Sequence, residues 1–176
     1  INYKTSVSPP SISCTTNASP GGGCSPDLLI SEYVEGTSSN KYIEIANYTG
    51  SAVNLGNYRL RLFSNGASAP SSDILLSGTL NNQATIVYKN ASAVVYTGTT
   101  TTNSAVNFNG DDAVGLYKIS TAAYVDIFGR IGEDPGTAWT SGVFSTLDKT
   151  LVRNSSITSG IITNPSAGFP TLSTQW

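Results

Sequence analysis

Short segments in which apolar and polar residues alternate, separated by turn signals, dominate the chain from residue 27 onward. Alternation with a period of two is typical of strands that bury one face. No window has the 3.6-residue periodicity of a useful amphipathic helix. The sequence therefore predicts an all-β fold, a sandwich or a barrel. The β-prone runs are 28–34, 42–46, 58–62, 85–88, 113–119 and 124–128, and the turn signals are Thr49-Gly50, Ser64-Asn65-Gly66, Asn81-Asn82, Asn109-Gly110 and Asp134-Pro135-Gly136.

Alternation also predicts which residues share a face of a strand. In the first run it groups Leu28, Ile30, Glu32 and Val34. In the second run it places Glu44 opposite Ile43 and Ile45. A covered carboxylate without a partner is costly, so we expect Glu44 to pair with a basic residue in a structural role. The basic residues that we expect to serve are Lys41, Arg59 and Arg61.

The first 26 residues have a different character. Prolines and a run of three glycines, Gly21-Gly22-Gly23, block both helix and central strand there. We expect residues 1–26 to be a linker or the tail of a preceding module, and residues 27–176 to be one β-sandwich domain. Cys14 and Cys24 lie in this first stretch. In an oxidising compartment they would close a short loop, worth about 3 kcal/mol; the alternative is two free thiols.

The charge content limits the partners of the chain. Charged residues make up 11% of the 176 residues, and the net charge is −2. The polar surface must therefore consist largely of Ser, Thr, Asn and Gly, as on many extracellular β proteins. The nine basic residues are scattered, which argues against binding nucleic acid through a basic patch. No apolar run approaches the roughly 20 residues of a membrane helix. We expect a secreted or cell-surface protein.

The absence of histidine removes whole classes of catalysis. Ser-His-Asp and Cys-His arrangements need an imidazole to move the proton. Paired carboxylates remain, and a hydrolase of that kind would use two acids that flank a cleft. The pairs to consider are Glu32 with Glu44 and Asp111 with Asp112. The competing interpretation is that these acids bond to turns and basic residues at strand ends.

Calcium is the cofactor that the sequence allows, because it takes carboxylate and carbonyl oxygens and needs no histidine. Glu32 and Glu35 lie beside a Gly-Thr-Ser-Ser-Asn loop, and Asp111 and Asp112 follow Asn109-Gly110. These four acids are the predicted calcium ligands, although neither stretch has EF-hand spacing. The alternative is that Asp111 and Asp112 cap a turn through backbone N–H groups. If calcium binds, chelation should lower the melting temperature.

Aromatic residues offer a further type of site. Exposed coplanar rings would form a sugar-stacking platform, whereas buried rings would only pack the core. The rings in question are Trp139, Trp176, Tyr33, Tyr42 and Tyr48.

From Leu29 to Trp176 the chain resembles the bacterial lamin-tail domain. The stretches that carry the resemblance are 30–36 (ISEYVEG), 39–47 (SNKYIEIAN), 55–60 (LGNYRL), 64–66 (SNG), 107–117 (NFNGDDAVGLY), 125–132 (VDIFGRIG), 134–136 (DPG), 149–153 (KTLVR) and Trp176. The resemblance implies an immunoglobulin-like β-sandwich. Bacterial members resemble accessory modules of secreted or surface proteins such as extracellular nucleases. The resemblance implies no catalytic residue.

These observations lead to one functional prediction and two alternatives. We expect a non-catalytic interaction or tethering module within a larger secreted bacterial protein. Its partners would be neighbouring domains of the parent protein and a surface protein or polysaccharide. The alternatives are a carbohydrate-binding module and a hydrolase with paired carboxylates.

Overall fold

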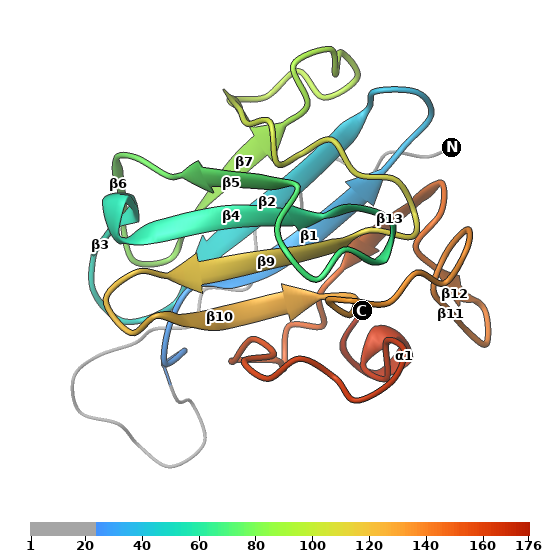
Figure 1. Cartoon of the computed structure of the whole chain (residues 1–176). Helices are drawn as coiled ribbons and strands as arrows, with labels where there is room; N and C mark the ends of the chain where they lie inside the picture. The colour runs from blue at the N-terminus through green and yellow to red at the C-terminus, as the bar shows by residue number, and fades with distance from the viewer. Residues whose placement is uncertain (1–23) are drawn as a thin grey trace.

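The structure is a computed structural model that describes residues 24–176, and two packed β-sheets form its body (Figure 1). The first sheet has the strand order β13-β1-β2-β7-β8, and the second has the order β10-β9-β4-β5. Within residues 24–176 the strand pairs are antiparallel except for the parallel pair of β7 and β8. The predicted all-β, immunoglobulin-like sandwich is confirmed.

The strands of the first sheet are β1 (Leu29–Glu35), β2 (Lys41–Asn47), β7 (Ala84–Lys89), β8 (Thr101–Thr102) and β13 (Lys149–Val152). Those of the second sheet are β4 (Tyr58–Phe63), β5 (Ser72–Leu75), β9 (Ala113–Lys118) and β10 (Ala123–Phe128). Two short pairs complete the strands: β3 (Val53–Asn54) with β6 (Thr79–Leu80), and β11 (Thr140–Ser141) with β12 (Phe144–Ser145). The helical elements are short, namely the 3₁₀ turns η1 (Leu55–Asn57) and η2 (Ser64–Gly66) and the helix α1 (Leu172–Gln175).

Strand β1 departs from the alternation that its sequence predicts. The pairing of β1 with β2 shifts register between Ile30 and Glu32. Such a bulge adds one residue and reverses the faces beyond it. Ile30 and Tyr33 are therefore both buried in the core, whereas Glu32 lies opposite Glu44 on the outer face. The predicted grouping of Ile30 with Glu32 on one face is wrong, because a bulge cannot be read from the alternation itself.

A stack of aromatic rings occupies the core between the two sheets. Tyr33 lies between Phe108 and Phe128, with ring centroids 4.7 Å and 4.0 Å away. The rings of Phe169 and Trp176 meet Phe128 edge-on. The Tyr33 hydroxyl donates to the carbonyl oxygen of Asn109 at 3.2 Å. The stack therefore connects β1 to the loop that precedes β9.

A buried carboxylate joins the two sheets at the other end of the stack. Asp126 of β10 is 0% exposed. It accepts the backbone N–H groups of Ile30 and Ile161, both at 2.8 Å, and pairs with Nη2 of Arg153 at 2.9 Å. Burial raises the pKa of the Asp126 carboxyl, and the charge of Arg153 and the two N–H donors act against that rise.

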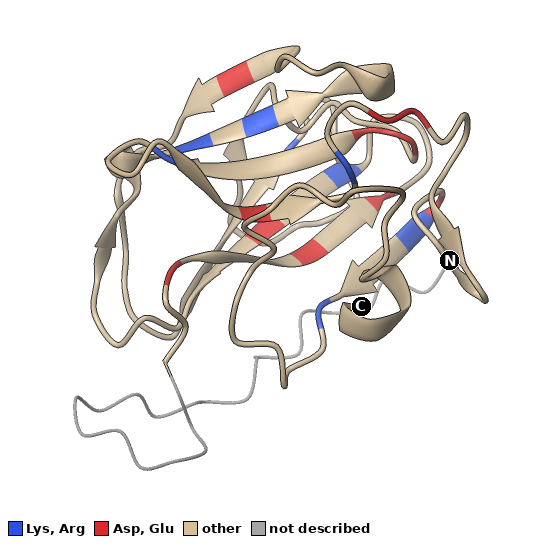
Figure 2. Ribbon diagram, turned by 60° about the horizontal axis from the view of Figure 1, so that its bottom comes forward, with Lys and Arg blue, Asp and Glu red and all other residues tan. Residues whose placement is uncertain are grey.

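Charged residues are dispersed over both sheets and the loops, as Figure 2 shows. Among the described residues, no helix is long and apolar enough to cross a membrane. Cys24 is disulfide-bonded. Cys14 and the rest of the predicted linker up to residue 23 lie outside the described residues, so the linker and the domain boundary at residue 27 stay predictions.

We expect Asp126→Asn to destabilise the fold by about 3–5 kcal/mol, because the substitution leaves the buried Arg153 guanidinium without a compensating charge. The measurement is urea unfolding followed by fluorescence. Asp73→Asn is the matched control: Asp73 pairs with Arg59 and Arg61 at the surface, and loss of such a pair costs less than about 1 kcal/mol. Equal losses in the two variants would contradict a central role for Asp126.

Candidate functional site

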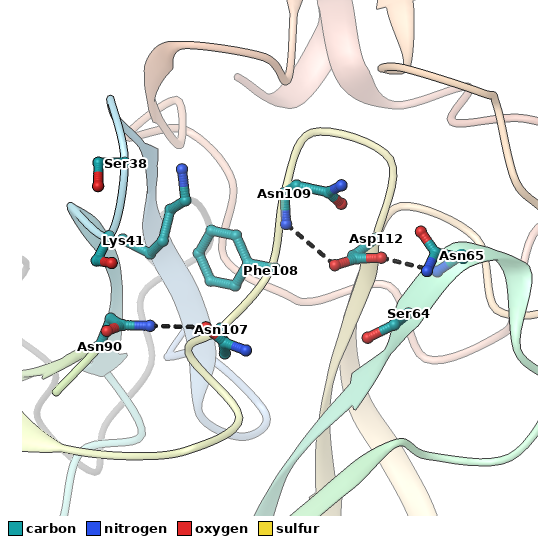
Figure 3. Close-up of a pocket in the computed structure, with 10 residues that line it drawn as sticks. Ser38, Lys41, Ser64, Asn65, Asn90, Asn107, Phe108, Asn109 and Asp112 are labelled. Atoms are coloured by element: carbon teal, nitrogen blue, oxygen red, sulfur yellow. Dashed lines mark hydrogen bonds between the residues drawn. The ribbon is translucent and has the colours of Figure 1, made fainter. Parts of the chain in front are cut away.

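A pocket of about 370 Å³ opens at one end of the sandwich, where loops from both sheets meet (Figure 3). One wall comes from the β1–β2 loop, the start of β2 and the residue after β7. The other wall comes from η2 and the loop before β9. The lining residues are Ser38, Ser39, Lys41, Ser64, Asn65, Asn90, Asn107, Phe108, Asn109 and Asp112.

The basic group in this pocket is neutralised within its own hairpin. Lys41 and Glu35 face each other where β1 and β2 pair. The buried ammonium of Lys41 donates to the Glu35 carboxylate and to the carbonyl oxygen of Gly36. The second carboxylate oxygen of Glu35 accepts the N–H of Asp148. Lys41 therefore closes the β1–β2 loop rather than presenting a free positive charge.

The acidic group in the pocket holds the second wall together. Asp112 accepts the N–H of Asn65 at 2.8 Å and the N–H of Asn109 at 3.0 Å. Burial raises the pKa of the Asp112 carboxyl, and these backbone donors act against the rise. The expectation that Asp112 caps a turn is confirmed, and the same carboxylate also ties η2 to the 109–112 turn.

The turn at η2 depends on two residues that tolerate positive φ. Asn65 has φ +51° and Gly66 has φ +72°. Asn and Gly adopt this left-handed conformation most readily. A Cβ atom on Gly66 would lie 2.9 Å from the backbone nitrogen of Asp134. The Ser64-Asn65-Gly66 turn signal therefore fixes how η2 approaches the neighbouring loop and presents the Asn65 N–H to Asp112.

Uncharged hydrogen-bonding groups face the opening. Asn65, Asn107 and Asn109 are exposed. In the described part of the chain, the side-chain amides of Asn65 and Asn109 make no hydrogen bond, and Asn107 accepts one from Asn90 at 2.9 Å. The sequence indicated the two turns that carry Asn65 and Asn109 but not that they meet. The exposed amides of the pocket thus include Asn65 and Asn109, which the sequence analysis named in turn signals and not as site residues.

The four predicted calcium ligands are not brought into one group. Glu32 lies on the outer face of the first sheet, and Glu35 binds Lys41. Asp111 and Asp112 lie in the loop before β9, where one oxygen of Asp111 is buried without a hydrogen-bond partner among the described residues. Within residues 24–176 no three His, Cys, Asp or Glu side chains are grouped as a metal site requires.

In each carboxylate pair considered for hydrolysis, the two acids are neighbours. Glu32 and Glu44 are opposite each other in the first sheet, whereas Asp111 and Asp112 are consecutive residues of the loop before β9. Glu44 lies opposite Glu32 across the β1–β2 pair and accepts the Ser31 hydroxyl at 2.6 Å. Burial, and then the charge of Glu44, raise the pKa of Glu32 to about 7.

The prediction that Glu44 pairs with Lys41, Arg59 or Arg61 is wrong. The three basic residues pair elsewhere: Lys41 with Glu35, and Arg59 and Arg61 with Asp73 across β4 and β5.

The predicted aromatic platform does not form from the rings considered for it. Tyr33, Tyr42 and Trp139 are buried in the fold, and Tyr48 and Trp176 are half-buried.

Strand pairing places an arginine against a tyrosine ring on the outer face of the second sheet, a contact that the sequence analysis missed. The Arg61 guanidinium lies 3.6 Å from the ring centroid of Tyr117. Alternation in β4 and β9 points both residues outward, but only the β4–β9 register shows that they meet.

Comparison with known proteins identifies one family. A family model described as Lamin Tail Domain matches residues 24–132. The match covers more than half of the chain and includes every residue that lines the pocket. No curated protein matches the chain.

We expect the free energy of unfolding to fall as pH rises from about 4.5 to about 7, and Glu32→Gln to remove part of that fall. In this window the folded protein keeps a proton on Glu32 that the unfolded chain has lost, so stability decreases as pH rises. Because Glu32 is partly exposed, solvent screens its charge. We therefore expect Glu32 to contribute about 1–2 kcal/mol to the fall in the free energy of unfolding. Asp148→Asn, at an exposed carboxylate, is the control. Identical pH profiles for Glu32→Gln and the unsubstituted chain would contradict the raised pKa.

We expect thermal melting in calcium chloride and in EDTA to give midpoints within about 1 °C of each other, because only an ion bound to the folded state would raise the melting temperature. The four acids do not converge, and the Glu35 and Asp112 carboxylates already hold other groups. A calcium-dependent rise that disappears in Asp111→Asn would instead place an ion at the loop before β9.

Proposed function

The chain belongs to the lamin tail domain family, and we propose that it acts as a non-catalytic interaction module of a larger secreted or surface-attached protein. In this role the sandwich holds the loop-end pocket in a fixed shape. The pocket binds a partner, and the rest of the parent protein supplies any chemistry. This proposal extends the family assignment to a specific surface of this chain.

The observation that carries the proposal is the bonding of the charged groups in the pocket. A nucleophile or a proton-transferring group must be free to contact the substrate. Here Lys41 binds Glu35, and both oxygens of Asp112 accept backbone N–H groups. The groups left to contact a ligand are amides and serine hydroxyls, and a serine hydroxyl needs an adjacent base to act as a nucleophile. Both charged residues of the lining are engaged with other partners. The pocket is therefore suited to recognition.

Two features support an extracellular setting. Cys24 is disulfide-bonded, and stable disulfides belong mainly to oxidising compartments. The surface is also built with few charges and many Ser, Thr and Asn residues. The Pro- and Gly-rich composition of residues 1–26 suits a tether that spaces this module from a neighbouring domain.

A second candidate function is hydrolysis by the Glu32–Glu44 pair. A carboxyl with a raised pKa is typical of a general acid, and the pKa of Glu32 is raised to about 7 beside Glu44. Neither residue lines the loop-end pocket. Release of product from polysaccharide or ester substrates that is lost in both Glu32→Gln and Glu44→Gln would favour this candidate over the interaction module.

The interaction module can be tested by retention on surfaces. The full chain is mixed with insoluble cell-envelope preparations and with plates coated with extracellular polymers, and the bound fraction and any released product are measured. We expect binding without product release, and a loss of most binding in Asn109→Ala. That substitution removes an exposed amide and leaves the backbone bonds of residue 109 in place.

The matched control is Asn57→Ala, an exposed asparagine in η1 at the opposite end of β4. It should bind like the unsubstituted chain. Equal binding by the two variants, or product release by the unsubstituted chain, would contradict the proposal.

A further inference from the structure

We infer that the loop-end pocket recognises a neutral, hydroxyl-rich carbohydrate by hydrogen bonding, without a stacking ring. This inference rests on the proposed function, since it names the ligand class of the same pocket. This mode of binding differs from the aromatic platform that the sequence analysis considered, because three of the rings of that platform, Tyr33, Tyr42 and Trp139, are buried.

The hydrogen-bonding groups of the pocket match hydroxyl groups in kind. Each asparagine amide offers two donors and an acceptor, and each serine hydroxyl both donates and accepts. A sugar hydroxyl also donates and accepts, so neighbouring hydroxyls of one ring can bond both ends of one amide. Asn65 and Asn109 make no side-chain hydrogen bond in the described residues and stand on the wall formed by η2 and the 109–112 turn. Ser38 stands on the opposite wall (Figure 3), and Ser39 follows it in the same β1–β2 loop.

The charges around the pocket favour a neutral ligand. The Lys41 ammonium is paired with Glu35, so an anionic ligand would have to compete with a carboxylate that is already bound and buried. The Asp112 carboxylate is held by two N–H groups and disfavours a second anion. A cation would find no free carboxylate in the lining, because both oxygens of Asp112 already accept backbone N–H groups. An uncharged ligand does not need either charged group to give up its present partner.

The shape and lining favour a carbohydrate over a peptide. Protein partners bind through apolar or aromatic anchors, or by adding a strand to a free sheet edge. The ring that lines this pocket, Phe108, is 2% exposed and stacked on Tyr33. The other lining residues are polar, and apart from Lys41, which begins the fully paired strand β2, they come from loops and turns. The volume of about 370 Å³ lies at the low end of the range for small-ligand sites, about 300–1,000 Å³.

The pocket is preorganised for such a ligand. Asp112 fixes the distance between η2 and the loop before β9, and Tyr33 holds the carbonyl oxygen of Asn109 from below. The side chains that bind are therefore mounted on backbone that is already bonded. Binding without a stacked ring is weak, and we expect a Kd on the order of 0.1–1 mM.

The test uses a printed array that carries neutral glycans, uronate-containing and sulfated glycans, and peptides, followed by calorimetry with the best neutral oligosaccharide. We expect binding to at least one neutral class. The affinity should be unchanged between about 50 and about 500 mM salt, because an uncharged ligand has no ionic interaction to screen.

Variants then connect the ligand to the pocket. Asn109→Ala and Asn65→Gly should each weaken binding by about tenfold; glycine suits the positive φ at position 65. Asn57→Ala should bind normally, and Asn109→Gln should retain more affinity than Asn109→Ala because it keeps the amide.

The outcomes separate this inference from the proposed function. Binding only to acidic glycans or only to peptides would overturn the ligand class. Binding to the cell envelope that depends on Asn109, but that no neutral glycan competes away, would also overturn the ligand class. The proposal of an interaction module would survive that result. Neutral-glycan binding that is unaffected by Asn109→Ala and Asn65→Gly would overturn the assignment to this pocket, and envelope binding unaffected by Asn109→Ala would contradict both.

Discussion

The buried carboxylate of Asp126 is the constraint on which the arrangement of the two sheets depends. It lies at a register shift in β10, between Tyr124 and Asp126, and it accepts the N–H of Ile30 beside the register shift in β1. A bulge leaves backbone groups outside the ladder, and a buried N–H without a partner is costly. The two irregular positions therefore satisfy each other across the core. Arg153 supplies the charge that lets this carboxylate remain buried.

The consequences of that contact reach the pocket through β1. The bulge reverses the alternation, so Tyr33 and not Glu32 points into the core. Tyr33 then stacks on Phe108 and bonds the carbonyl oxygen of Asn109. Two residues further on, Glu35 points inward and captures Lys41. The exposed amides of the pocket thus stand on loops that the core holds from beneath, and such support fixes the positions of side chains on loops.

The sequence predicts the local chemistry well and the long-range contacts poorly. The strands and the Ser64-Asn65-Gly66 turn follow from alternation and from residues that accept positive φ. The role of Asp112 as a cap follows from its place after Asn109-Gly110. The bulge in β1 is invisible, because it depends on Asp126 almost a hundred residues away. The expected partner of Glu44 fails for the same kind of reason, since Arg59 lies in the other sheet and pairs there with Asp73.

Under the proposed function, a pocket of amides and hydroxyls suits a module that is one part of a larger protein. With few charges on its surface, the chain has little electrostatic steering to speed its encounters. Without an exposed ring, each binding event is weak. Tethering changes this balance, because a linked second site acts at an effective concentration in the millimolar range and multiplies the overall affinity without new contacts. The Pro- and Gly-rich composition of residues 1–26, the predicted linker, suits such a link. Under the proposed function, the low affinity of the single pocket suits a parent protein that is held at a polymer surface by more than one contact.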